Sequence, residues 1–125
     1  MTVPYDAQAE LETIGVALSS DYPRPDLTPD QFYVVAHREL WAIILTLTDR
    51  PIRGIHLPEH LRPLARKAST NWDSGSPTRA VQRVADCATA RSVLAAVHDL
   101  NLAAEDVDLP GVYDIVADIY KHLAT

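Results

Sequence analysis

The sequence predicts an all-α fold. Apolar residues recur at spacings of three and four along most of the 125 residues, which is the pattern of one face of a helix. No stretch of the sequence alternates apolar and polar residues in the way of a half-buried strand. Prolines and capping residues divide the chain into segments of helical length. We therefore expect a compact helical bundle with one long helix and a C-terminal amphipathic helix.

The first helix is expected from Asp6 to Ser19. Asp6 is a good N-cap, because its carboxylate can accept a hydrogen bond from a free amide of the first turn. A loop containing Pro23 and Pro25 follows, and both prolines oppose continuation of the helix. The predicted apolar face consists of Ala7, Leu11, Ile14 and Leu18.

A second helix is predicted from Pro29 to about Asp49. Thr28 and Gln31 fit a capping box, and Pro29 is well placed as the first helical residue. Pro51 prevents further extension. The predicted apolar face consists of Phe32, Ala36, Leu40, Ile43, Ile44 and Leu47.

Prolines also shape the middle of the chain. Between Ile52 and Thr70 we expect a short turn, a kink at Pro63 and a short helix over residues 64–68. Residues 71–75 read as a loop, in which Trp72 either folds back onto the domain or anchors a partner. Ser76 and Pro77 then begin a long helix that reaches about Ala104.

The last helix follows an acidic break over residues 105–108. Asp108 can cap it, and Pro110 is tolerated in its first turn. We expect its apolar stripe to be covered by the long helix, by a second copy of the chain or by a partner protein. This gives a helical domain over residues 1–104 and a linker-like helix over residues 105–125. The stripe, which is the candidate partner interface, consists of Val112, Ile115, Val116, Ile119 and Leu123.

The amino-acid composition argues against several classes of function and site. The chain has 11 Lys and Arg against 17 Asp and Glu, a formal charge of -6, which disfavours non-specific binding to nucleic acid. One cysteine excludes an internal disulfide and a cysteine-based zinc site. The sequence has no run of about 18 apolar residues and no signal-peptide pattern at its start. We expect a soluble, cytoplasmic protein.

Signatures of catalysis are weak. The sequence contains no phosphate-binding glycine motif and no nucleophile elbow, and Cys87 reads as a small buried hydrophobe. His56, Glu59 and His60 match the H-x-x-E-H pattern of inverted zincins, but Pro58 places His56 ahead of the helix that the pattern needs. We expect no enzyme activity, metal or cofactor, and keep a small metal-dependent hydrolase at His56 and His60 as a minor alternative.

Basic side chains form two small groups. Arg62 and Arg66 lie close in sequence to Lys67, and Arg79 and Arg83 are separated by one helical turn. Solvated helix faces are the simpler interpretation. A small accessory protein that contacts nucleic-acid phosphates through these arginines is the alternative.

Two segments carry a family resemblance. The first has an early proline, an Ala-Glu pair and an aliphatic-Gly pair, here Pro4, Ala9-Glu10 and Ile14-Gly15. The second has a Phe-Tyr pair, three residues, a His-Arg pair and an aliphatic-aromatic pair, here Phe32-Tyr33, His37-Arg38 and Leu40-Trp41. Together they resemble the N-terminal domain of DnaB-type replicative helicases. A weaker likeness over residues 90–94 and the helix from Leu109 resembles the last hairpin helix and the linker helix of that family, without its RecA-type ATPase domain.

The resemblance implies a function as well as a fold. It implies a non-enzymatic module for protein–protein interaction in DNA replication, with a replicative helicase, a primase or a helicase loader as partner and a homodimer as the favoured assembly. The region from Ile52 to Ser76 is shorter than in the family and lacks its Gly-Gly step.

The family-motif residues are expected to be structural. We expect Gly15 to allow close approach of two helices, Phe32 to face the core, His37 to be packed with one hydrogen bond, and Arg38 to form an ion pair with a carboxylate such as Glu10.

Overall fold

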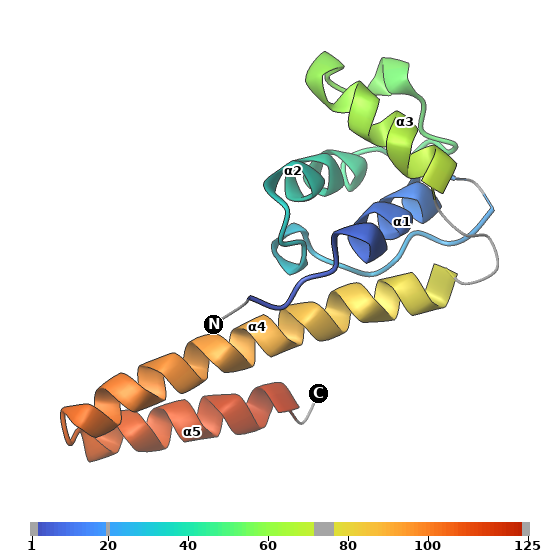
Figure 1. Cartoon of the computed structure of the whole chain (residues 1–125). Helices are drawn as coiled ribbons and strands as arrows, with labels where there is room; N and C mark the ends of the chain where they lie inside the picture. Colours follow the sequence, from blue (N-terminus) through green and yellow to red (C-terminus); the bar gives the residue numbers. More distant parts are fainter. Residues whose placement is uncertain (1–2, 20, 72–76, 124–125) are drawn as a thin grey trace. The chain divides into compact units, whose positions relative to one another are not determined.

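The computed structural model describes residues 3–19, 21–71 and 77–123, and all regular structure in these residues is helical (Figure 1). The all-α fold is therefore confirmed. Three 3-10 turns, Pro29–Gln31, Gly54–His56 and Glu59–Leu61, lie between the longer helices. The α-helices are α1 (Ala7–Leu18), α2 (Val35–Ile44), α3 (Arg62–Asn71), α4 (Pro77–Glu105) and α5 (Leu109–Leu123).

The described residues form two compact units that divide within α4. The core unit, Tyr5–Asp86, holds α1, α2, α3 and the start of α4. The hairpin unit combines residues 3–4 with residues 87–123, and so holds the rest of α4 and the whole of α5. The division expected between residues 104 and 105 corresponds instead to the turn that joins α4 to α5.

The core unit is organised around α1, which packs against α2 and most extensively against α3. Ile14 of α1 is fully buried, as are Phe32, Leu40 and Trp41. The rings of Phe32 and Trp41 lie 4.8 Å apart between centroids, and the Trp41 indole N–H donates to the Leu27 carbonyl at 2.9 Å. Burial of Phe32 and Leu40 confirms the predicted core positions.

Helix α1 follows the prediction closely. It starts after Asp6, whose carboxylate accepts from the Ala9 amide at 3.0 Å, and it ends at Leu18. Leu11, Ile14 and Leu18 are buried. Ala7 is exposed, because it lies in the first turn outside the face that packs on the other helices.

The second predicted helix was wrong at both ends. The Thr28 capping box is present, but it caps only the 3-10 turn Pro29–Gln31. Residues 32–34 are then extended, since their amides and carbonyls bond to side chains of α1 and α2, and α2 starts at Val35. The helix ends at Ile44 rather than near Asp49. The buried face is shifted accordingly, and it includes His37 and Trp41 while Ala36 is exposed.

The kink expected at Pro63 does not form. Helix α3 runs without a break from Arg62 to Asn71, and Pro63 lies in its first turn. Proline is accepted there because amides of the first turn have no intrahelical partner. Trp72, the residue considered as a partner anchor, lies outside the described residues.

The hairpin unit agrees well with the prediction. Helices α4 and α5 have nearly the predicted bounds, and α5 runs back alongside α4 (Figure 1). Asp108 caps α5, with its carboxylate accepting from the Gly111 amide at 3.1 Å. None of the described helices has the length and apolarity that crossing a membrane requires.

Candidate interaction site

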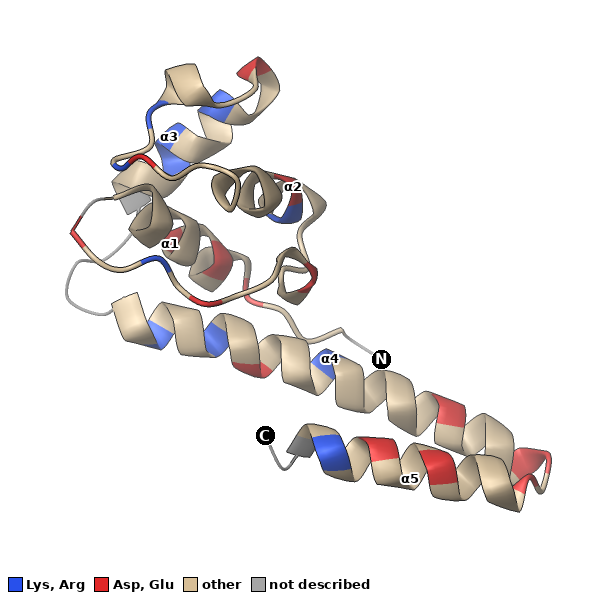
Figure 2. Cartoon of the chain, turned by 180° about the vertical axis from the view of Figure 1, so that it is seen from behind, with Lys and Arg blue, Asp and Glu red and all other residues tan. Residues whose placement is uncertain are grey.

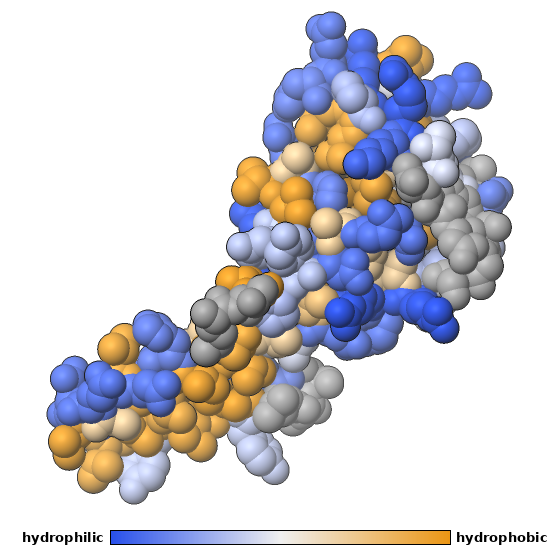
Figure 3. All heavy atoms as spheres, in the orientation of Figure 1, coloured by the Kyte–Doolittle hydropathy of each residue, from blue (hydrophilic) through white to orange (hydrophobic). Residues whose placement is uncertain are grey.

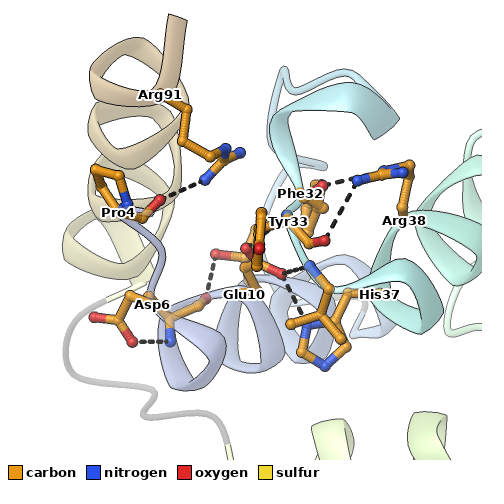
Figure 4. A network of polar contacts seen from close by, with 11 residues as sticks. Pro4, Asp6, Glu10, Phe32, Tyr33, His37, Arg38 and Arg91 are labelled. Carbon is orange, nitrogen blue, oxygen red and sulfur yellow. Dashed lines mark hydrogen bonds and ion pairs between the residues drawn. The ribbon is translucent and has the colours of Figure 1, made fainter. Parts of the chain in front are cut away.

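A polar network in the core unit is centred on the buried Glu10 and links the two motif segments through Tyr33, Val34 and His37 (Figure 4). Glu10 projects from α1 and is only 1% exposed. Its carboxylate accepts from the amides of Tyr33 and Val34 at 2.9 and 3.2 Å, and from Nδ1 of His37 at 2.9 Å. The two motif segments are thus tied together through one side chain, 23 to 27 residues apart in sequence.

The electrostatics of Glu10 favour the charged form. Burial acts to raise the pKa of this carboxyl, but the hydrogen bonds from His37, Tyr33 and Val34 outweigh burial, so the pKa lies below its usual value. A buried carboxylate that accepts three hydrogen bonds is satisfied, and it has a structural role here.

Three motif residues can be compared with their expected roles. His37 is buried and bonded to Glu10, as expected. Arg38 is not the partner of Glu10. Its guanidinium donates instead to the carbonyls of Phe32 and Tyr33 at 3.2 and 3.3 Å, because those carbonyls are left free by the extended residues that precede α2. Gly15 is buried in α1, the helix that packs most extensively against α3.

Two further arginines of the core unit donate hydrogen bonds to backbone carbonyls that follow or end a helix. Arg50 donates to the Val16 carbonyl near the end of α1 at 3.0 Å, and Arg24 donates to the Leu47 carbonyl beyond α2. The cation of Arg50 is favourable at the negative end of α1. Burial and then the nearby charge of Arg24 lower the pKa of Arg50. The sequence offered no signal for this pair, because both partners are distant in the chain.

The arginines proposed to contact nucleic-acid phosphates lie in different structural environments. Arg83 forms an ion pair with the N-cap Asp6 at 3.2 Å, so it is engaged in the fold, whereas Arg79 is exposed on α4. Arg62 and Arg66 lie on α3, one turn apart, and both line a surface hollow together with Arg53. Sequence reasoning did not identify Arg53, which lies on a different segment.

The histidines of the zincin pattern do not share a helix. His56 belongs to one 3-10 turn and accepts from the Arg53 amide at 3.2 Å, while His60 belongs to the next turn and pairs with Glu39 at 2.7 Å. The helical register that the metal site needs is therefore not formed. Within the described residues, no group of three or more potential ligands could hold a metal ion. Cys87 is buried, as predicted.

The predicted partner stripe of α5 is divided between two environments. Val112, Ile115 and Ile119 are half-buried in the hairpin unit, whereas Val116 is 47% exposed. Leu123 is the last residue of α5. Most of the predicted stripe therefore packs within its own unit.

A second apolar stripe lies on the exposed side of α5, and we refer to it as the outer stripe. Its spacing of three and four residues places its members on one helix face. Tyr113 and Tyr120 are 70% and 76% exposed, and Leu109 is 57% exposed. Figure 3 shows apolar residues gathered over α4 and α5. The outer stripe consists of Leu109, Tyr113, Val116 and Tyr120.

A shallow apolar hollow adds to the surface of the hairpin unit. It has a volume of about 440 Å³ and lies along α4, where the chain start also contributes. Arg91 fixes that arrangement by donating to the Pro4 carbonyl at 3.0 Å (Figure 4). Val3, Leu94 and Val97 supply the apolar lining. The hairpin unit therefore exposes apolar side chains on both of its helices.

Comparison with protein-family models, with curated proteins and with solved structures finds no significant match for this chain.

Proposed function

We propose that this protein is a non-enzymatic module for protein–protein interaction in DNA replication, and that the outer stripe of α5 docks on a replicative helicase. The outer stripe is the observation that carries the proposal. The resemblance of the two sequence motifs to the helicase N-terminal domain supports the choice of partner.

The outer stripe has the chemistry of an interface. Two tyrosines, a leucine and a valine would lose contact with water on docking, and tyrosine is enriched among residues that dominate binding energy. Each fully buried aliphatic side chain contributes roughly 1.5–3 kcal/mol. Apolar side chains in a row on one exposed helix face are typical of a surface that is covered by a partner.

The charges around the stripe specify the partner further. The sequence of the hairpin unit is acidic, with Arg91 and Lys121 as its only Lys or Arg residues, and red segments of the ribbon in Figure 2 mark the Asp and Glu residues of α4 and α5. A complementary surface would be an apolar groove with basic residues at its rim. The carboxylates are Asp99, Glu105, Asp106, Asp108, Asp114 and Asp118.

Co-purification with the replicative helicase of the source organism tests the proposal. The tagged chain is expected to retain the helicase, and the triple variant Tyr113→Ser, Val116→Ser, Tyr120→Ser is expected to lose it. The variant should keep the melting temperature of the parent chain, because the substituted side chains are exposed.

The variant Ala117→Ser is the matched control, since Ala117 is exposed on the same helix but lies outside the stripe and carries no charge. It should retain the helicase. Failure of the parent chain to bind the purified helicase would contradict the proposal, and so would undiminished binding by the triple variant.

A further inference from the structure

A hollow of about 320 Å³ lies on the surface of the core unit beside α3. Part of its lining is apolar, since Leu18, Ile52 and Ala65 are buried members of the hydrophobic core. Three arginines line it, namely Arg53, Arg62 and Arg66, and the hydroxyl-bearing Ser69 lies at the same wall. No carboxylate is among the described residues that line it.

Hydrogen bonds hold the walls of the hollow in place. The Arg62 Nε–H donates to the carbonyls of Gly54 and Leu57 at 2.9 and 3.2 Å, which joins the start of α3 to the 3-10 turn. The Ile52 amide donates to the Leu18 carbonyl at 3.0 Å, which joins the opposite wall to the end of α1. The arginines are therefore carried by backbone segments that are already fixed to one another.

The guanidinium groups retain free donors. Within the described part of the chain, Arg53 and Arg66 make no side-chain hydrogen bond or ion pair, and Arg62 is bonded only through Nε. Arginine stays charged at all ordinary pH values, so three positive charges face one small space. Like charges that lack a counter-charge repel one another, and a bound anion would remove that repulsion.

We propose that this hollow binds a phosphate group. Guanidinium groups donate paired N–H bonds in a geometry that matches the oxygens of phosphate, and a tetrahedral phosphate can accept from three arginines at once. The volume of about 320 Å³ leaves room for a phosphate that is attached to a larger molecule. A phosphodiester of single-stranded nucleic acid and the phosphates of a free nucleotide share this chemistry.

Fluorescence anisotropy with a short, labelled oligothymidylate at low ionic strength tests the proposal. The parent chain is expected to bind, and Arg53→Gln with Arg66→Gln is expected to weaken binding about tenfold, since each substitution removes charge-assisted hydrogen bonds. Inorganic pyrophosphate, titrated alone, should raise the melting temperature of the parent chain and leave that of the double variant unchanged. Both side chains lack partners among the described residues, so the variant should fold normally.

Arg79→Gln is the matched control, because Arg79 is an exposed arginine of the same unit that lies outside the hollow. It should bind like the parent chain. An equal loss of binding in this control would show diffuse electrostatic attraction and overturn the proposal. Absence of any response to both probes would overturn it as well.

The two probes also distinguish the source of the phosphate. Binding of the oligonucleotide with competition by pyrophosphate assigns a nucleic-acid backbone, whereas a response to pyrophosphate without oligonucleotide binding assigns the phosphates of a small free molecule. The proposal is independent of helicase docking, because the hollow belongs to the core unit and the outer stripe to the hairpin unit.

Discussion

Glu10 shows how a single charged residue organises the core unit. An acid that is 1% exposed is costly unless its oxygens are fully bonded, and here a histidine and two backbone amides supply the donors. The amides belong to residues just before α2. The same contact that satisfies the carboxylate therefore keeps that segment extended and sets where the helix begins.

The lowered pKa of Glu10 predicts a pH dependence of stability. A carboxyl whose pKa is lower in the folded state contributes stability above its unfolded pKa, near 4.5, and loses that contribution as the pH falls through the folded value. We expect Glu10→Gln to reduce the free energy of unfolding at pH 7 by about 2–4 kcal/mol. The deficit should shrink as the pH falls below about 4.5.

Urea unfolding of both chains across this pH range measures the difference. Glu59→Gln is the matched control, since Glu59 is exposed and should change stability by less than about 0.5 kcal/mol. A deficit of Glu10→Gln that stays constant with pH would contradict the ionic role of this carboxylate.

The turn between α4 and α5 is a tight turn centred on Val107. The Asp108 amide donates to the Ala103 carbonyl and the Val107 amide to the Ala104 carbonyl, which together form a Schellman motif. Val107 occupies its left-handed position, with φ of 53°. Glycine is the usual residue there, because a β-branched side chain is strained in this conformation.

Replacing Val107 is predicted to strengthen the hairpin unit. Val107→Gly should remove the strain and raise the free energy of unfolding by about 1 kcal/mol, less a few tenths for the added freedom of the unfolded chain. Val107 is 77% exposed, so little packing is lost. Val107→Ala keeps a Cβ in the left-handed region, so it should raise the free energy of unfolding by much less than glycine does. An equal gain from alanine in thermal melts would show that exposure of the valine, rather than its backbone, was unfavourable.

Gly111 lies just after the same turn, at the start of α5. A Cβ at this position would clash with the Asp108 carboxylate, the group that caps α5. The absence of a side chain at residue 111 thus allows the cap that begins the last helix.

Among the described residues, the two units differ in whether they bury large apolar side chains completely. The core unit buries Phe32, Leu40 and Trp41 completely. The hairpin unit leaves Val97 and Leu102 of α4 exposed as well as the outer stripe of α5. Two helices alone cannot enclose a core, so the hairpin unit is the part that gains most from a further surface.

We predict that the chain associates with a second copy of itself to form a dimer. Light scattering at high concentration should give the mass of a dimer, twice the 13.8 kDa of the chain. Because each chain carries a formal charge of -6, added salt should screen the repulsion and strengthen the dimer. A clean monomer mass at high concentration and high salt would contradict the prediction.

Sequence reasoning predicted the helices whose ends are determined locally. Asp6, Pro77 and Asp108 mark the starts of α1, α4 and α5 within about one residue of where they lie, because capping and proline act through neighbouring backbone groups. The start of α2 was missed, because it depends on Glu10, more than 20 residues away in the chain. Arg53 was also not predicted, because only folding brings its segment next to Arg62 and Arg66.

Local patterns in the sequence were therefore sufficient to predict the all-α class, the positions of the long helix and the terminal helix, and the burial of Phe32 and Leu40. These features follow from apolar spacing and local capping, which do not require knowledge of neighbours in space. The tertiary structure was needed to show that Glu10 bonds to His37 rather than Arg38 and that three arginines line one hollow. It also decided which side of α5 remains exposed, because each of these outcomes depends on contacts between segments that are distant in the chain.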